Sequence, residues 1–282
     1  MPFRYTNIAA ILFFISPMVQ EQTLSVPERQ HQILCLLTRQ PRITVAGICE
    51  QFSISEATAR RDLETLASQG KLQRVHGGAI GALQAPPEPP MIQRQVEQAD
   101  EKAAIGQTAA GLVQDGDTVF LGSGTTVLEV ARNLWSNRAL WQPRGLTVIT
   151  NSLPVINILV DVPEITLVSL GGMLRHSELS FIGHITEQAI AEVRADKVFI
   201  GIHALSLEQG LTNDYLPETM TDRAILQAGR EVILVVDHTK IGRVSTALLA
   251  PIDCVHTIVT DQHTPQDFIT AVESRGIRLI IA

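Results

Sequence analysis

A polar stretch beginning at Ser55 carries side chains that could contact nucleic acid. Ala59, Leu63 and Leu66 recur there at helical spacing, which predicts an amphipathic helix capped by Ser55 and ending near position 69. An arginine near the start of such a helix can donate two hydrogen bonds to a guanine or contact a phosphate. The candidate DNA-contacting residues of this helix are Ser55, Glu56, Thr58, Arg60 and Arg61.

A second basic group follows in Lys71, Arg74 and His76. The short runs 71–75 and 79–82 flank a glycine pair, so this segment predicts a small hairpin whose cations would contact the DNA backbone. Two arginines on an exposed helix often only face solvent and bind no DNA. Here the charge distribution favours DNA, because residues 27–80 hold seven basic and five acidic side chains in a chain of net charge −7.

A glycine-rich loop lies between a β-branched run and an apolar helical stripe, and it consists of Gly122, Ser123, Gly124, Thr125 and Thr126. The free N–H groups at a helix N-terminus favour an anion, and glycine lets a ligand approach the backbone closely. The Lys-Ser/Thr ending of a nucleotide-binding P-loop is missing. Because glycine turns before helices are often only turns, the loop alone favours phosphate binding and a plain turn about equally.

Four further polar residues follow other predicted strands: Asn151, Arg175, Asp237 and Lys240. In an open parallel sheet, ligands bind beyond the carboxyl ends of the strands. Arg175 and Lys240 could supply positive charge to a phosphate, whereas Asn151 and Asp237 could bind hydroxyl groups. Each of the four could also be a solvated loop residue.

The elements that would position these residues fall into two predicted domains. Three short helices, over 26–39, 45–52 and 55–69, precede the hairpin and predict a winged helix-turn-helix domain at 27–82. The proline-rich stretch 83–91 predicts an extended linker, because proline can continue neither a helix nor a central strand.

The remainder, 92–282, predicts a doubly wound α/β domain. A polar helix is expected over 93–114. Beyond it, near-continuous apolar runs alternate with helical stretches, which is typical of a parallel sheet covered on both faces. The predicted strands are 118–122, 146–150, 165–170, 197–202, 232–237, 257–260 and 277–281. The predicted fold class is therefore α/β, with an N-terminal winged helix-turn-helix and a C-terminal doubly wound parallel sheet.

Composition excludes several function classes. A chain of 282 residues, 45% of them hydrophobic, can build two domains with cores of their own. Aromatic residues make up only 4%, which argues against a base-stacking platform for single strands. Cys35, Cys49 and Cys254 form no C-x-x-C pair, so neither a disulfide scaffold nor a zinc site is predicted. We expect no metal, no cofactor and a cytoplasmic location.

Residues 1–26 predict an extension outside the two domains. Arg4 and the apolar run 8–15 resemble a short signal peptide or part of a membrane span. The run is far shorter than the roughly 20 residues that a span needs, so we expect no membrane association. No clean cleavage site follows the run. The hypothesis is that Met18 is the true start; a native protein whose intact mass begins at Met1 would contradict it.

The first predicted domain resembles the DeoR-type bacterial transcription regulators. The resemblance covers residues 27–80 and is specific, because it extends from the first helix through the third helix to the hairpin. The residues that carry it are Glu28-Arg29, Ser55-x-x-Thr58-Ala59-Arg60-Arg61-Asp62-Leu63-x-x-Leu66, Gly70-Lys71-Leu72 and Arg74-Val75-His76-Gly77-Gly78-Ala79.

Residues 91–282 are similar to the sensor domain of the same family. The matching residues are Glu101-Lys102-x-x-Ile105, Gly122-x-Gly124-Thr125-Thr126, Thr150-Asn151, Gly171-Gly172-x-x-Arg175, Gly183 and Asp237-x-x-Lys240-x-Gly242. The resemblance implies a fold like that of ribose-5-phosphate isomerases and a phosphorylated sugar as effector, which commonly releases such a regulator from its operator. Phe120-Leu121 stands where an acidic residue is frequent, so one hydroxyl contact and the identity of the sugar stay open.

Two other function classes compete with a sensor. A sugar-phosphate isomerase-like enzyme with an accessory DNA-binding module needs a base beside the reacting carbon, yet Gly201–Leu205 contains no carboxylate pair. His203 could be that base, although a lone histidine at a strand end is more often structural. An interaction protein without a small ligand would tolerate bulky substitutions in the loop 122–126.

Together the residues and the resemblance predict a regulator and not an enzyme. We expect a repressor of a carbohydrate-metabolism operon that binds double-stranded operator DNA and a phosphorylated sugar. A lone winged helix contacts only a few base pairs, so a homodimer or homotetramer is expected.

Overall fold

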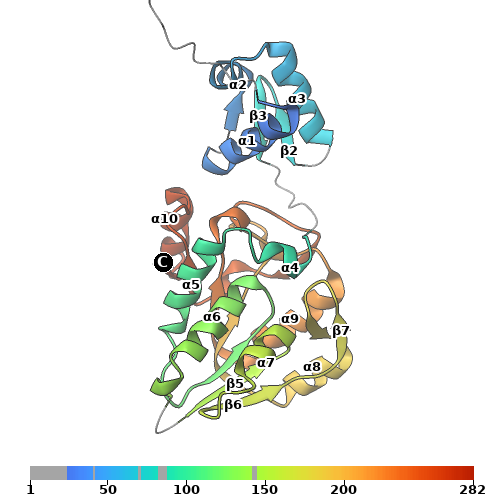
Figure 1. Ribbon diagram of the computed structural model, residues 1–282. Coiled ribbons are helices and arrows are strands. Elements are labelled where there is room, and N and C mark those ends of the chain that lie inside the picture. The colour runs from blue at the N-terminus through green and yellow to red at the C-terminus, as the bar shows by residue number, and fades with distance from the viewer. Residues whose placement is uncertain (1–23, 41, 69–70, 82–87, 142–144) are drawn as a thin grey trace, which may run out of the picture.

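A computed structural model describes residues 24–40, 42–68, 71–81, 88–141 and 145–282 (Figure 1). Three features named above lie outside these ranges. They are Met18, Gly70 and most of the predicted linker. Among the described residues, no helix combines the length and the apolar character that crossing a membrane requires.

The N-terminal unit is a three-helix winged fold. Its order is α1 (Val26–Arg39), β1 (Arg42–Thr44), α2 (Val45–Phe52), α3 (Glu56–Ser68), β2 (Leu72–Val75) and β3 (Gly78–Gly81). The strands form an antiparallel sheet in the order β1-β3-β2. Sequence sets these bounds: Ser25 and Glu28 form a capping box at α1, and the Thr44 side chain accepts a hydrogen bond from Gly47 N at α2.

One small core holds the three helices and the wing together. Ile33 of α1, Ile48 of α2 and Leu63 of α3 are at most 1% exposed. Leu72 and Ala79 add the two wing strands to the same cluster. Burial of these side chains fixes which face of α3 points inward, and therefore which face remains for a ligand.

The second unit is built on a parallel sheet of seven strands. The strand order is β15-β14-β12-β9-β4-β5-β6, and each neighbouring pair is parallel. In chain order the strands are β4 (Thr118–Leu121), β5 (Leu146–Thr150), β6 (Ile165–Ser169), β9 (Ala195–Ile200), β12 (Gly229–Val235), β14 (Thr257–Thr260) and β15 (Arg278–Ile281). The predicted α/β class with a doubly wound parallel sheet is confirmed.

Helices cover both faces of this sheet. One core contains side chains of α5 (Ala99–Ala110), α6 (Thr125–Ser136) and α7 (Leu153–Leu159), whereas the other contains those of α8 (His184–Ala191), α9 (Leu216–Ala228) and α10 (Gln266–Ser274). Along β4, Val119 and Leu121 enter the first core and Phe120 enters the second. The alternation explains why the strand reads as a continuous apolar run.

The predicted helix 93–114 is not continuous. It consists of α4 (Met91–Arg94) and α5, with Gln98 between them in a left-handed conformation at φ 46°. The Lys102 ammonium donates to the carbonyls of Arg94 and Glu97, at 2.6 Å each. A side chain thus satisfies carbonyls at the end of the first helix, and the chain changes direction without leaving them unpaired.

Two small antiparallel sheets are additions that the sequence did not predict. One pairs β7 (Met173–Arg175) with β8 (Ser180–Ile182), and the other has the order β10 (Ala204–Ser206), β11 (Gly210–Asn213), β13 (Ala247–Ala250). Strands of three or four residues are too short to give an alternating pattern. They matter because residues next to them reach the carboxyl edge of the large sheet.

Candidate functional site

Charged side chains lie at the N-terminus of α3, and two of the predicted residues cap this helix. Ser55 Oγ accepts from Thr58 N at 3.2 Å and lies 2.9 Å from Thr58 Oγ1. Their hydroxyls therefore hold the helix end as well as facing outward. Glu56 and Arg60 form an exposed ion pair of 2.9 Å. Arg61 is also exposed, and its side chain makes no hydrogen bond or ion pair with another described residue.

The wing packs beside this helix. Arg74 donates to the carbonyl of Arg60 at 3.3 Å, which places the predicted wing cation next to the predicted helix cation. Arg42 of β1 donates to the carbonyl of His76 at 2.9 Å and supports the tip of the hairpin. Lys71, Arg74 and His76 are all exposed. The structure thus leaves the predicted wing residues accessible to a ligand.

A buried ion pair fixes α3 against α1. Arg29 Nε lies 2.6 Å from Asp62 Oδ2, and both side chains are more than nine-tenths buried. Gln30 adds a hydrogen bond of 3.1 Å to the same carboxylate. Both members belong to the motifs that carried the family resemblance, but their spacing of 33 positions gave no signal that they meet. They position the exposed face of α3.

The second candidate site is a pocket at the carboxyl edge of the parallel sheet. Of the predicted effector residues, Ser123, Gly124, Thr125, Thr126, Asp237 and Lys240 line it. The remaining lining residues are Glu88, Arg94, Glu97, Gln98, Lys102, Glu178, Gly201, Ile202, His203, Asn213, Glu218, Asp222, Val235, Val236 and Thr239.

The N-terminus of α6 forms one wall of this pocket. Gly124 precedes the helix at φ 110°, a conformation that favours glycine, and Leu128 N donates back to its carbonyl. Thr125 and Thr126 are 5% and 8% exposed. Their hydroxyls and the free N–H groups of the first helical turn can accept an anionic ligand.

Three cationic side chains lie in the same pocket, and a carboxylate sits among them. Glu88 Oε1 lies 2.9 Å from both Lys240 Nζ and Arg94 Nη1, and Glu88 Oε2 lies 3.0 Å from His203 Nδ1. Burial alone would raise the pKa of Glu88, but His203, Lys240 and Arg94 outweigh it and hold the pKa well below its usual value. Burial lowers the pKa of the third cation, Lys102.

Acidic side chains line the same pocket. Asp222 accepts from Asn213 Nδ2 at 2.8 Å, and burial raises the pKa of Asp222 to about 7. Burial likewise raises the pKa of Glu178, which pairs with Arg94. Carboxylates and an amide of this kind accept hydrogen bonds from hydroxyl groups. The pocket therefore combines groups that can bind an anion with groups that can bind hydroxyls.

Three predicted effector residues do not line the pocket. Gly122 donates its N–H to the carbonyl of Phe199 at 3.0 Å, and Asn151 donates its side chain to the carbonyl of Phe181 at 2.9 Å. Arg175 pairs with Glu218, which does line the pocket, and lies 3.5 Å from Asp214.

Most of the charged lining was missed at the level of sequence. Glu88 lies within the predicted linker and Arg94 lies just after it, in a region whose prolines predict only a spacer. Lys102 belongs to a matched motif, but nothing in its spacing placed it near Lys240. Glu178, Asn213, Glu218 and Asp222 come from the small sheets and α9, which the sequence did not place at this edge.

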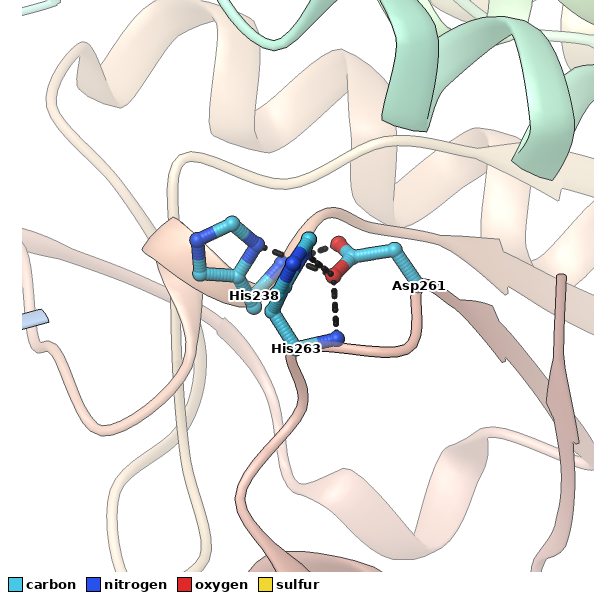
Figure 2. Close-up of side chains that lie close together, drawn as sticks. All are labelled: His238, Asp261 and His263. Atoms are coloured by element: carbon cyan, nitrogen blue, oxygen red, sulfur yellow. Dashed lines mark hydrogen bonds and ion pairs between the residues drawn. The ribbon is translucent and has the colours of Figure 1, made fainter. Parts of the chain in front are cut away.

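A separate cluster lies where β12 and β14 end (Figure 2). His238 Nδ1 is 3.0 Å and His263 Nδ1 is 3.4 Å from Asp261 Oδ1. Burial alone would lower the pKa of His238, but its hydrogen bond to Asp261 outweighs this and raises it. The backbone N–H groups of His238 and His263 also donate to the Asp261 carboxylate, at 2.8 and 2.9 Å. His238 is not among the residues that line the pocket, whereas its neighbours Asp237 and Lys240 are.

Two domain families match this arrangement. Residues 29–84 match the DeoR-like helix-turn-helix domain, and residues 97–262 match the DeoR C-terminal sensor domain. The chain belongs to the DeoR family. This family membership assigns the chain to the transcriptional regulators and confirms the family predicted from the motifs.

Several relatives are similar in sequence to this DeoR-family regulator over nearly its whole length. The transcriptional repressor AccR of Agrobacterium fabrum is 35% identical over 92% of this chain and 98% of that protein. The transcriptional repressor GlcR of Bacillus subtilis is 33% identical, covering 90% and 95%. The glycerol-3-phosphate regulon repressor of Escherichia coli is 32% identical, covering 89% and 97%.

Solved structures are more distant. Ribose 5-phosphate isomerase A of Methanocaldococcus jannaschii aligns with a TM-score of 0.39 at 20% identity, over 51% of this chain and 55% of that one. The full-length sorbitol operon regulator SorC of Klebsiella pneumoniae aligns with a TM-score of 0.37 at 14% identity, over 87% and 97%.

Proposed function

We propose that this DeoR-family regulator is a repressor of a carbohydrate-metabolism operon whose affinity for operator DNA is set by a phosphorylated sugar. Three relatives at 32–35% identity are named as repressors, and one of those names includes a phosphate ester. A DNA-binding regulator acts where the chromosome is, so the proposal includes a cytoplasmic location.

The DNA-binding part of the proposal rests on α3 and the wing. α3 buries Ala59, Leu63 and Leu66 and exposes Arg60 and Arg61. We expect Arg61 to contact base edges, because its side chain is exposed and has no partner among the described residues. We expect Lys71, Arg74 and His76 to contact phosphates, which would position the helix without specifying sequence.

The observation that carries the effector proposal is that one pocket holds two kinds of binding group. The α6 N-terminus, Lys102 and Lys240 favour a dianionic phosphate. Asp222, Asn213 and Asp237 favour the hydroxyl groups of a small polyol. Either kind of group alone would be a common surface feature, whereas the two within one pocket match a phosphorylated sugar or sugar-like ester.

Thermal unfolding of the full chain tests this part. The panel pairs each phosphorylated sugar, and glycerol 3-phosphate, with its unphosphorylated counterpart. At one hundred times its Kd a ligand should stabilise the sensor domain by about 2.7 kcal/mol. We expect a shift only with phosphorylated compounds, and its loss in Thr126→Val, which removes one hydroxyl from the α6 wall. A panel without any shift would contradict the sugar-phosphate assignment.

Assembly into a homodimer or homotetramer is part of the same proposal. Ile185 of α8, Leu216 and Met220 of α9, and Leu248 of β13 are each more than half exposed. α9 packs against both α8 and β13, so these side chains belong to neighbouring elements. We call these four residues the α9 apolar face. An apolar group of this kind is typical of a subunit interface.

The isomerase-like enzyme remains the alternative function. The observation in its favour is Asp222, a buried acid with a pKa near 7 in a pocket that also holds His203. An aldose–ketose isomerase would exchange the substrate's C2 proton with solvent. We expect no such exchange when phosphorylated sugars are incubated with the protein in D2O and followed by NMR. Exchange that disappears in Asp222→Asn would favour the enzyme.

A further inference from the structure

The cluster of His238, Asp261 and His263 has the geometry of a cation site (Figure 2). One nitrogen or oxygen from each residue lies within 4.8 Å of those from the other two. Asp261 is 2% exposed and His238 is 13% exposed, so two of the three ligands are held by the fold. His263 is 55% exposed, which leaves a path from solvent.

The distances fit a small transition-metal ion. Bonds of about 2.0–2.1 Å in a tetrahedron place neighbouring ligand atoms roughly 3.3 Å apart. The two imidazole nitrogens lie 3.0 and 3.4 Å from the Asp261 oxygen. Two imidazoles with a carboxylate suit Zn²⁺ or its neighbours in the first row and not Mg²⁺ or Ca²⁺.

We infer that these side chains bind one Zn²⁺-class ion, which would link the loops after β12 and β14. Binding would replace the hydrogen bond between His238 Nδ1 and Asp261. The ordinary alternative is a hydrogen-bonded cluster in which Asp261 accepts from two imidazoles and two backbone N–H groups. The two differ in one measurable way, because only a metal site binds one ion per chain and loses affinity for it when His263 is replaced.

The test is a Zn²⁺ titration of the untagged full chain after treatment with a chelator, followed by calorimetry. We expect about one ion per chain, and at least tenfold weaker binding in His263→Gln, whose partners His238 and Asp261 stay paired. His184→Gln, an exposed histidine at the start of α8, is the matched control and should bind like wild type. No stoichiometric binding, or an equal loss in both variants, would overturn the inference.

A second observation concerns Glu88, the first described residue after the gap 82–87 that separates the two units. Its side chain is 12% exposed, and its carboxylate contacts Arg94, His203 and Lys240. Its backbone N–H donates to Asp214 Oδ2 at 3.1 Å, so the main chain is anchored there as well. Glu88 therefore reaches into the pocket from the segment that leads to the wing.

Glu88 occupies the groups that a phosphate would use. Lys240 makes its ion pair with Glu88, and Arg94 divides its guanidinium between Glu88 and Glu178. Two anions placed together against the same cations repel each other strongly when they are shielded from water. A phosphorylated ligand and the Glu88 carboxylate would therefore compete.

The geometry points to Glu88 as an internal anion that the effector's phosphate displaces. This step rests on the proposed sugar-phosphate function. Displacement would also release the hydrogen bond from Glu88 N to Asp214. The effector then distinguishes two states of Glu88, which is the condition for it to act on a second site.

Inorganic phosphate is the probe, titrated into the full chain. Glu88→Gln keeps the size of the side chain but removes its charge, so we expect phosphate to bind at least fivefold more tightly. Glu192→Gln removes the same charge at an exposed glutamate outside the pocket lining, and should change the Kd less than twofold. Hydrogen exchange of a peptide containing Glu88 should increase on phosphate binding in the wild type.

The outcomes separate the inference from the proposed function. Equal phosphate affinity in wild type and Glu88→Gln, with both folded by circular dichroism, would overturn the displacement and leave the anion site intact. An equal gain in Glu192→Gln would show a general charge effect and would also overturn it. Failure of every variant to bind phosphate or any phosphorylated sugar would remove both the site and its internal occupant.

Discussion

Arg60 and Arg61 are adjacent, yet their surroundings differ. Arg60 is paired with Glu56, whereas Arg61 has no described side-chain partner. We predict that Arg61→Ala lowers the preference for operator over random DNA by about 1–3 kcal/mol, because an arginine that reads a base contributes that much discrimination. Fluorescence anisotropy with a selected operator and a scrambled duplex measures it. Lys71→Ala is the control, and should weaken both duplexes alike and reduce the salt slope by about one.

Asp62 is the residue that holds this face in place. Arg29→Met would leave its carboxylate buried without its cation, and we predict a loss of about 3–5 kcal/mol in unfolding free energy. Urea unfolding followed by circular dichroism measures the loss. The double variant Arg29→Met with Asp62→Leu removes both charges and should recover most of it. A single variant as stable as wild type would contradict the structural role of the pair.

Asp222 should give the sensor domain a characteristic pH dependence. Its pKa is about 7 in the folded protein against 3.8 for the ordinary group, so the folded state holds the proton between these values. Stability should therefore fall as pH rises from about 4 to about 7, by about 1.4 kcal/mol for each unit of difference. Asp222→Asn should remove this fall, as judged from melting temperatures across that range. Asp253→Asn, at an exposed aspartate, should leave it unchanged.

At the scale of elements, the turn between α2 and α3 stores strain. Ser53 ends α2 in the left-handed conformation, at φ 51°. A side chain in that conformation costs roughly 1–2 kcal/mol, and glycine avoids most of this cost. We predict that Ser53→Gly stabilises the DNA-binding unit by about 1 kcal/mol in urea unfolding, whereas Ser53→Val destabilises it. Stabilisation by Val instead would show that the turn relaxes in solution.

The elements also show what sequence patterns can and cannot reveal. Capping residues and apolar spacing predict α1, α2 and α3 to within about a residue, because those signals are local. The break between α4 and α5 depends on Lys102 donating to carbonyls several positions away. No local propensity contains that contact, so the pattern gives one long helix where the fold has two.

The residues of the candidate site also differ in whether local sequence patterns can reveal them. The glycine loop is found because a strand, two glycines and a helix must be consecutive in the chain. Glu88, His203 and Lys240 meet only after β9 and β12 are placed side by side, and their separation in sequence carries no period. Asp62 and Arg29 similarly meet only when α1 packs on α3. Long-range charge pairs of this kind depend on topology, which short patterns do not encode.

At the scale of the whole molecule, function depends on how many copies of the winged unit reach DNA together. A single α3 covers a few base pairs, so a monomer should bind weakly, and linking two units raises the effective concentration of the second. The α9 apolar face supplies the expected contact between sensor domains. Because Met220 and Leu248 are about half exposed, charged substitutions there should disturb assembly without disturbing the monomer's core.

We therefore predict that Met220→Glu with Leu248→Glu converts the protein to monomers and weakens operator binding by at least tenfold. Light scattering coupled to size exclusion measures the mass, and anisotropy on the same samples measures DNA affinity. Val160→Glu, at an exposed apolar residue at the end of α7, is the matched control and should change neither. Monomers that bind DNA as tightly as wild type would separate assembly from recognition. An unchanged mass would place the interface elsewhere.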